Sequence, residues 1–585
     1  MKPISPYSLV LIVTALLIAV IMQVPQLLHM QSPLYHGVLV QLNSDEDVYL
    51  AHLEESLTGR PEQSNEAIVG DPSLMGSHAG SFERIEGTLL RPTGLRAATV
   101  EQIMDSVVPS AIFLALILFF SLCRFSRWAS YIGACAFVLI ELYSLNRPVQ
   151  PRGSFLLLIL ALSAIIAGLE PPPPGPLPRA SPSLRSGSAR ERGRRLLLGC
   201  IGGAILGMLV GVYFWAWTFG WLWFGLLFVF TMIEWWWHRS REALRRVGLL
   251  CLFGLITAVA AVPSFLKLQT ITRHPLYADA VFRSGVHAGR LPESWPYSIL
   301  FTVMAIGVVF AWWKRSGRDR NTYATVTVVT AFVAIHQQIL HGVTFNFVSH
   351  YLFALVMAAI CVVMMWHAIP SVGGFAGASV SCKLALRLSA IAAAIYLAAI
   401  AYDGRHIVNQ WTVRASRFEE QHFATLLPVL DGLPRTMILS DSKTSLFLAG
   451  STKHDVVYTL YLKNVLMSHE EIAARYCATQ IPVTPVDRHL ELQQPIYPDA
   501  DSAFNPPTGS GDPSVPAREQ EMVKKACEEA DRDPAAALKR FGVQYVLWDE
   551  KRQPTWNLKR LKVPLMKASS GSGWSFWSLK EVSPL

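Results

Sequence analysis

Residues 107–123 read VVPSAIFLALILFFSLC, a run of seventeen residues without a charged side chain. A helix of about that length crosses the ~30 Å hydrocarbon core of a bilayer. Similar apolar runs recur along the chain, and together they predict eleven membrane spans. The expected spans are residues 8–28, 107–123, 129–145, 153–169, 196–213, 220–237, 248–266, 298–313, 323–340, 350–367 and 385–402.

The composition agrees with a membrane protein. The chain has 585 residues, of which 52% are hydrophobic and only 16% are charged, whereas soluble proteins are about 25% charged. A β-barrel is excluded because it would show alternating segments of about ten residues. The long run 196–237 is divided at an expected aromatic turn, Phe214–Gly220, because Trp prefers the membrane interface.

The basic residues fix the expected orientation. One alternating set of connections holds Arg124, Arg127, the stretches 179–195, 239–246 and 314–320, Lys383 and Arg387. The connections near 146–152, 214–220 and 341–349 hold only Arg147 and Arg152. Basic loops stay in the cytoplasm. We therefore expect a cytoplasmic N-terminus and exterior segments at 31–106 and 403–585, in a bacterial inner membrane. The net charge of +9 follows from these loops and does not indicate nucleic-acid binding.

The expected fold is an α-helical polytopic membrane protein with a large first exterior loop and a C-terminal exterior α/β domain. Its regions are the N-terminal transmembrane helix (1–30), exterior loop 1 (31–106), the helical bundle (107–402) with a Pro/Arg-rich cytoplasmic linker (170–195), and the exterior domain (403–585). In that domain we expect strands near 436–439, 456–458 and 543–548, helices near 467–477 and 518–541, and a final hairpin. Cys477 and Cys527 can pair there if the compartment is oxidising; the sequence leaves this open.

The strongest local signal is Asn43-Ser44-Asp45-Glu46-Asp47-Val48-Tyr49-Leu50-Ala51 in the first exterior loop. Carboxylates at the start of a helix are favourable to its dipole, which is a purely structural explanation. A functional explanation is that one of them takes a proton from an acceptor hydroxyl, or that Asp45 and Asp47 hold a divalent metal ion.

An Asp-Glu-x-x-Tyr motif in the first exterior loop, after a lone N-terminal span, resembles the GT-C superfamily of integral-membrane glycosyltransferases. The protein O-mannosyltransferase and aminoarabinose-transferase group is the most similar in layout. The resemblance implies that Asp45 is the catalytic base, that Glu46 supports it and that Tyr49 is the aromatic position of the motif. Asp47 is an alternative base.

Two further polar clusters are candidates for substrate binding. Near the exterior ends of the ninth and tenth spans lie Gln337, Gln338, His341, Asn346, His350 and Tyr351. The exterior loop 267–297 holds Arg273, His274, Arg283 and Arg290, although exterior loops are usually poor in Arg. Arginine binds phosphate in a bidentate manner, so this loop is a candidate for a leaving phosphate. Interfacial anchoring for the first cluster, and ion pairing with the acidic first loop for the second, are the structural alternatives.

These features predict a glycosyltransferase that moves a sugar from a polyprenyl-phosphate-linked donor to an exterior lipid, glycan or protein acceptor. The alternatives are a non-catalytic envelope scaffold with a GT-C-like fold, and a transporter or flippase for a lipid-linked substrate. A transporter is expected to show internal repeats and buried charges at the bilayer midplane, and the sequence shows no convincing repeat.

Overall fold

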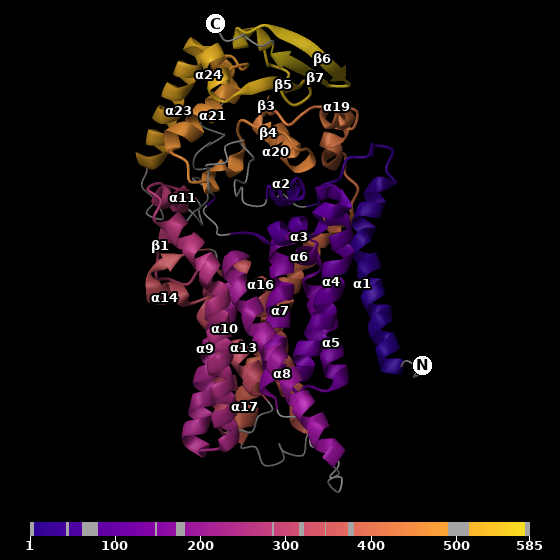
Figure 1. Ribbon diagram of the computed structural model, residues 1–585, viewed down its shortest axis with the longest axis vertical. Coiled ribbons are helices and arrows are strands. Elements are labelled where there is room, and N and C mark those ends of the chain that lie inside the picture. The colour runs from indigo at the N-terminus through magenta and orange to yellow at the C-terminus, as the bar shows by residue number, and fades with distance from the viewer. Residues whose placement is uncertain are drawn as a thin grey trace.

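The structure is a computed structural model that describes residues 5–42, 46–60, 76, 80–146, 149–170, 182–283, 286–314, 321–345, 347–371, 380–488 and 514–579. A long helical bundle carries a smaller domain, residues 404–579, at one of its ends (Figure 1). We call this part the C-terminal domain and the adjoining end of the bundle the domain end.

Eight of the described helices are long and apolar enough to cross a membrane. They are α1 (Pro6–Met30), α4 (Ala97–Leu122), α7 (Val149–Leu169), α8 (Pro182–Met208), α9 (Phe214–His238), α10 (Arg241–Thr272), α12 (Trp295–Lys314) and α17 (Val380–Asp403). Three shorter apolar helices are α5 (Arg127–Ile140), α13 (Thr322–Ala334) and α16 (Leu352–Ser371). Each of the eleven expected spans overlaps one of these helices, so the polytopic helical fold is confirmed.

The break between α8 and α9 lies earlier than expected. The 3₁₀ turn η2 (Leu209–Gly211) ends α8, and Tyr213 is extended before α9 begins at Phe214. The aromatic residues 214–220, which we expected to form a turn, are the first two turns of α9. They remain helical because their rings pack on the bundle and on one another.

Glycines allow α8 to pack closely against α10. A Cβ atom at Gly203 would lie 2.7 Å from the carbonyl oxygen of Phe253, and one at Gly207 would lie 2.3 Å from that of Thr257. Small residues at such contacts let helix backbones approach each other in a membrane, where apolar burial provides little driving force.

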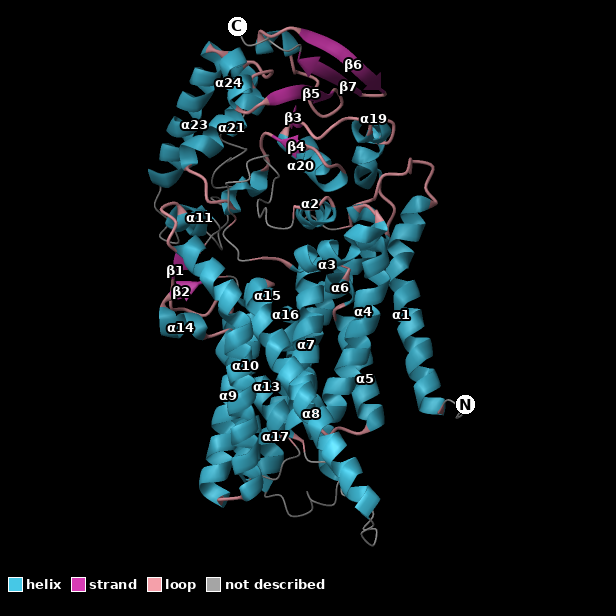
Figure 2. Cartoon of the chain, viewed as in Figure 1, coloured by secondary structure: helices cyan, strands magenta, loops and turns pink. Residues whose placement is uncertain are grey.

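Two short helices lie across the domain end, beneath the C-terminal domain (Figures 1 and 2). They are α2 (Glu46–Leu57) and α3 (Phe82–Leu90), and the 3₁₀ turn η1 (Arg91–Thr93) follows α3. Gly87 permits their crossing, since a Cβ atom there would lie 2.4 Å from the Cβ of Ser56. The carboxylate of Glu54 accepts a hydrogen bond from the backbone N–H of Ala97, which ties α2 to the start of α4.

The connections on one side of the domain end pair with each other. After α11 (Tyr277–Arg283), β1 (His287–Ala288) pairs antiparallel with β2 (Val343–Thr344). β2 lies between α14 (Gln337–His341) and α15 (Phe347–His350). The short helix α6 (Leu142–Leu145) follows α5.

The C-terminal domain is built on a five-stranded sheet with the order β4-β3-β5-β7-β6. β3 (Met437–Leu439) pairs parallel with β4 (Asp455–Val456) and with β5 (Val543–Asp549), while β7 (Trp574–Leu579) pairs antiparallel with β5 and with β6 (Leu565–Gly571). The other elements are η3 (Gly404–His406), α18 (Ile407–Trp411), η4 (Ala415–Phe423), α19 (Leu427–Asp431), α20 (Ser442–Ser451), η5 (Leu460–Asn464), α21 (His469–Gln480), η6 (Pro485–Asp487), α23 (Ser514–Arg532), α24 (Pro534–Arg540) and η7 (Leu558–Leu561).

Most of the expected elements of this domain are present. The three strands, the helix capped by Ser468, the break before Pro534 and the final hairpin all occur. Cys477 and Cys527 form a disulfide that joins α21 to α23. Both cysteines belong to the buried core of the domain.

Candidate functional site

The acidic motif opens α2 at the centre of the domain end. Asp45, together with Asn43 and Ser44, lies outside the described residues, and α2 begins at the next residue, Glu46. Both carboxylate oxygens of Glu46 accept the backbone N–H of Leu42, at 3.1 and 3.0 Å. The carboxylate of Asp47 accepts a hydrogen bond from the side-chain amide of Gln41. Glu46 and Asp47 therefore bind the segment that precedes the motif, through the backbone of Leu42 and the side chain of Gln41.

Burial changes the acidity of these two groups. It raises the pKa of Glu46 well above its usual range, and the nearby charge of Asp105 raises it further. Burial together with the charge of Glu420 raises the pKa of Asp47 to about 7. Tyr49, the aromatic position of the motif, lies on α2 and is half-buried.

Below α2 lies an acidic cluster that the sequence reasoning missed. Arg152, at the start of α7, is fully buried, and its Nη2 donates to Glu101 at 2.7 Å. Its Nη1 donates to Asp105 and to the carbonyl oxygen of Leu145. The charges of Glu101 and Asp105 act on Glu46, so the motif lies directly beside this ion cluster.

Two more carboxylates reach the same cluster from α3. Glu83 and Glu86 are buried, and the charge of Arg152 acts on both. Burial raises the pKa of each to about 8. The only sequence signal for this cluster is the spacing of acids three residues apart on α3 and four apart on α4, which places each pair on one helical face.

The opposite side of α3 is basic. The charges of Arg84, on α3, and Lys267, near the end of α10, act on each other, and burial lowers the pKa of Arg84. Two cations held close together raise the local positive potential. Arg273 caps the end of α10 and is exposed, and its guanidinium makes no hydrogen bond to the described residues. We did not single out Arg84 or Lys267 from the sequence, because they belong to different regions.

The two polar clusters expected from the sequence meet through the β1–β2 pair. The backbone N–H of Gly289 donates to the carbonyl oxygen of Gly342 at 3.0 Å. Arg290 Nη1 donates to the carbonyl oxygen of Ile339 at 2.7 Å, and Gln338 donates to that of Ile335. Arg290 and Gln338 thus hold the backbone of this corner.

Tyr351 and His350 of the first cluster contact the start of α9, at Thr218 and Trp215. Gln337 donates to the Tyr351 hydroxyl, and His350 is hydrogen-bonded to the Tyr213 hydroxyl at 2.9 Å. The His350 ring stacks on Trp215 with a centroid distance of 3.7 Å. Burial and the charge of Arg290 lower the pKa of His341. Asn346 lies outside the described residues.

The other residues of the Arg-rich loop have separate positions. Arg283 is buried and donates to the carbonyl oxygens of Lys463 and Val465, at 3.0 and 2.7 Å. His274 Nδ1 accepts the backbone N–H of Leu276. In Figures 1 and 2, α14 and β1 lie at the side of the bundle while α2 lies over its centre. The structure therefore does not bring the Gln/His cluster onto the acidic motif.

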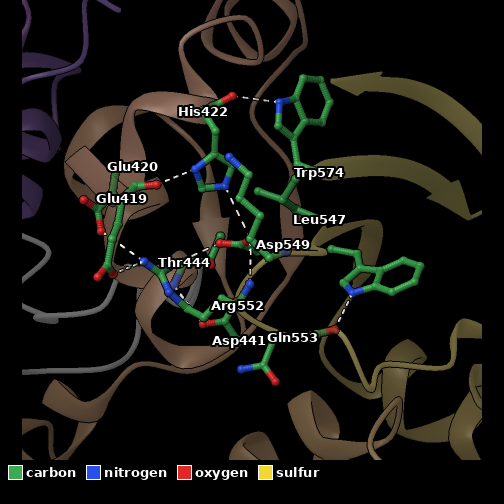
Figure 3. A network of polar contacts seen from close by, with 12 residues as sticks. Glu419, Glu420, His422, Asp441, Thr444, Leu547, Asp549, Arg552, Gln553 and Trp574 are labelled. Atoms are coloured by element: carbon green, nitrogen blue, oxygen red, sulfur yellow. Dashed lines mark hydrogen bonds and ion pairs between the residues drawn. The ribbon is translucent and has the colours of Figure 1, made fainter. Parts of the chain in front are cut away.

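Figure 3 shows a polar network of the C-terminal domain around Arg552. Arg552 donates to Glu420 at 3.2 Å and to Thr444 at 3.1 Å, and its guanidinium lies 3.5 Å from Asp549. The charges of Glu420, Lys443 and Arg552 act on Asp47. The C-terminal domain therefore contributes charges to the surroundings of the motif.

Within the described part of the chain, no group of three His, Cys, Asp or Glu side chains could hold a metal ion. Asp47 already accepts the Gln41 amide. Because Asp45 lies outside the described residues, the divalent ion considered from the sequence stays a prediction, and we assign it no step.

No family model matches the sequence, and no curated protein matches it either. Several solved structures are similar in fold. ArnT from Cupriavidus metallidurans bound to undecaprenyl phosphate has 13% identity and a TM-score of 0.38, over 97% of each chain. The mycobacterial arabinofuranosyltransferase AftD has 13% identity and a TM-score of 0.43, over 97% of this chain and 40% of its own.

The oligosaccharyltransferase of Archaeoglobus fulgidus in the apo form has 11% identity and a TM-score of 0.45, over 98% of this chain and 74% of its own. These proteins are membrane glycosyltransferases, the group that the sequence resembles. The likeness concerns the fold, and the function is argued from the residues of this chain.

Proposed function

We propose that this protein transfers a glycosyl group from a polyprenyl-phosphate-linked donor to an acceptor hydroxyl at the domain end of the bundle, with Asp45 as the general base. The observation that carries the proposal is the placement of the motif helix α2, whose buried Glu46 lies against Glu101 and Asp105. An acidic motif enclosed in this way, at the end of a membrane bundle, suits proton removal from a hydroxyl that attacks a lipid-linked substrate.

Asp45 is the preferred base because its neighbours have other roles. Glu46 and Asp47 accept hydrogen bonds from Leu42 and Gln41. In the proposed reaction the acceptor O–H bond breaks, the proton passes to the Asp45 carboxylate, and the acceptor oxygen forms a bond to the sugar carbon. The bond between that carbon and the phosphate oxygen breaks, and the electron pair leaves with the lipid phosphate.

Arg84, Lys267 and Arg273 are the proposed partners of the lipid phosphate. The charges of Arg84 and Lys267 act on each other, so a bound dianion would relieve their repulsion and form charge-assisted hydrogen bonds. In this proposal the donor also contacts the polar cluster proposed from the sequence, beside the three cations. The cluster consists of Gln337, Gln338, His341, Asn346 and His350, and Arg290 supports it.

The membrane placement belongs to the same proposal. The connections away from the C-terminal domain carry the basic residues listed from the sequence, and basic connections stay in the cytoplasm. The domain end would then face the exterior of a bacterial inner membrane, where the acceptor arrives from the aqueous phase and the donor arrives from the bilayer.

The test is release of free polyprenyl phosphate by the purified protein with a panel of polyprenyl-phosphate sugars. Asp45→Asn is expected to abolish release while the protein stays folded, and Asp487→Asn, an exposed site in the C-terminal domain, is the matched control. Lys267→Met is expected to raise the KM for the donor about tenfold, the equivalent of one lost charge-assisted hydrogen bond.

Release that survives Asp45→Asn but not Asp47→Asn would move the base to Asp47. No release with any donor, from folded wild-type protein, would reject glycosyl transfer in favour of the scaffold or transporter functions.

A further inference from the structure

The segment that leads to the acidic motif, residues 36–42, forms neither helix nor strand. Backbone groups of His36, Val38 and Gln41 hydrogen-bond to side chains of η4, more than 370 residues later in the chain. The Gln421 side chain provides the most complete set. Its Oε1 accepts the backbone N–H groups of His36, at 2.8 Å, and Val38, at 3.2 Å, and its Nε2 donates to the carbonyl oxygen of Val38 at 2.7 Å.

Two other residues of η4 continue the contact toward the motif. Phe418 packs with Val40 and Leu42 in a small buried cluster. Arg417 Nη1 donates to the carbonyl oxygen of Gln41 at 3.0 Å. The order is antiparallel, because later residues of η4 contact earlier residues of the segment. We call Arg417, Phe418 and Gln421 the clamp.

The clamp ends where the motif carboxylates begin to hold the backbone. Arg417 binds the carbonyl of Gln41, while the side chain of Gln41 donates to Asp47 and the N–H of Leu42 donates to Glu46. Each residue from Val40 to Leu42 is thus held both by the clamp and, directly or through its neighbour, by α2. A chain held from both sides has few conformations, so the end of the segment at Leu42 and the start of α2 at Glu46 are fixed relative to each other.

Gln421 is suited to this work because it is almost completely buried, with 3% of its surface exposed. Removing the amide would leave two N–H groups and one carbonyl of the 36–38 backbone without their partner, and a buried polar group left unsatisfied is costly. The segment would relax toward water, and misplacement of a catalytic group by about 1 Å can lower a rate about a hundredfold.

We propose that the clamp is a positioning element of the catalytic site and that Gln421 is its principal positioning residue. The inference rests on the proposed function, because it takes Asp45 as the group being positioned. It differs from a role in general stability, since it requires local loosening of residues 36–42 to lower the rate of transfer.

The experiment compares full-length Gln421→Leu, which keeps the side-chain volume and removes the amide, with Ser416→Ala at an exposed position of the same turn. Hydrogen exchange in detergent micelles is measured over 33–42 and over β5, and transfer is measured as kcat and KM. Gln421→Leu is expected to speed exchange of the His36 and Val38 amides at least about tenfold, leave exchange in β5 unchanged, and lower kcat about tenfold or more with little change in the donor KM. Ser416→Ala is expected to match the wild type.

Unchanged exchange at residues 36–42, a uniform rise in exchange that includes β5, or faster local exchange with an unchanged kcat would each overturn the inference. If the wild-type protein transfers no sugar from any donor, the proposed function fails and the positioning role falls with it. The exchange comparison then still decides whether Gln421 holds the 36–42 segment, so the two failures are distinguishable.

Discussion

Glu83 shows how strongly burial controls the charge of a single side chain at this site. It is fully buried, and its pKa is raised from about 4.5 to about 8. The folded protein therefore binds a proton more tightly there than the unfolded chain does. By linkage, the contribution of Glu83 to stability falls as the pH rises from about 4.5 to about 8 and stays low above that range.

Glu83→Gln is expected to remove this dependence, because the amide keeps the size of the side chain and cannot ionise. The variant should be more stable than the wild type at pH 9, by about 2 kcal/mol or more, and nearly equal to it at pH 5. Thermal unfolding in detergent at the two pH values measures the difference. Glu528→Gln, on the exposed face of α23, should change stability little at either pH, and an equal gain for Glu83→Gln at both values would contradict the assignment.

The motif residues were predictable individually, but their separate roles were not. The sequence marks Asp45, Glu46 and Asp47 as a group, because acids are uncommon beside an apolar span. It does not report that Glu46 and Asp47 accept hydrogen bonds from Leu42 and Gln41. Those partners are set by how the preceding chain folds back.

The crossing of α2 and α3 determines where the acidic and basic sides of α3 lie relative to the motif. Gly87→Ala would bring a methyl group within 2.4 Å of the Ser56 Cβ and 3.1 Å of the Leu57 nitrogen. We expect this overpacking to lower the free energy of unfolding by about 1–3 kcal/mol. Transfer should also slow, because the two helices must shift.

Unfolding temperature and transfer rate measure these two effects. Gly248→Ala is the matched control, since a Cβ atom at this helical glycine of α10 would meet nothing within 4 Å. It should be neutral or slightly stabilising, because alanine favours helix over glycine. Equal behaviour of the two variants would show that the crossing does not depend on Gly87.

Hydropathy located the eleven apolar helices but not all their ends. α4 begins at Ala97, ten residues before the expected span. The expected span began too late because the first turns of α4 are polar and carry Glu101 and Asp105. Those turns lie outside an apolar window, yet Glu54 caps them and Arg152 pairs with their acids. Side chains from distant segments therefore decide where this helix starts.

The acidic cluster could not be predicted, because three regions build it. Glu83 belongs to α3, Glu101 to the polar start of α4, and Arg152 to the start of α7. The pairing of β1 with β2, which unites the two expected polar clusters, likewise joins segments about 55 residues apart. Sequence spacing shows which residues share a helical face, but not which faces meet.

The C-terminal domain is attached to the bundle at several separate points. Arg96 pairs with Asp431 near α2, and Arg283 donates to the carbonyl oxygens of Lys463 and Val465 on the side of α11. Buried carbonyl groups that lose a donor are expensive to leave unsatisfied. Because the attachment points are well separated, they fix the position of the C-terminal domain above the motif.

Arg283→Ala is expected to weaken the attachment of the C-terminal domain beside α11 and to lower the free energy of unfolding by about 1–3 kcal/mol. Hydrogen exchange should become faster over residues 460–467 and 277–283. Arg283→Lys should recover part of the protection, because its ammonium can reach one carbonyl at a time. Exchange that stays at the wild-type level in the alanine variant would contradict an anchoring role for Arg283.

The clamp also has a consequence for synthesis of the chain. His36 and its partner Gln421 are 385 residues apart, so at roughly 5–20 residues per second the ribosome adds the partner about 20–80 s after the first segment. During that interval the motif of the nascent chain lacks the contacts that hold it in the complete protein. A ribosome-bound chain that stops before residue 421 should therefore be inactive even with every span inserted, and catalytic competence would begin only after Gln421 has been added.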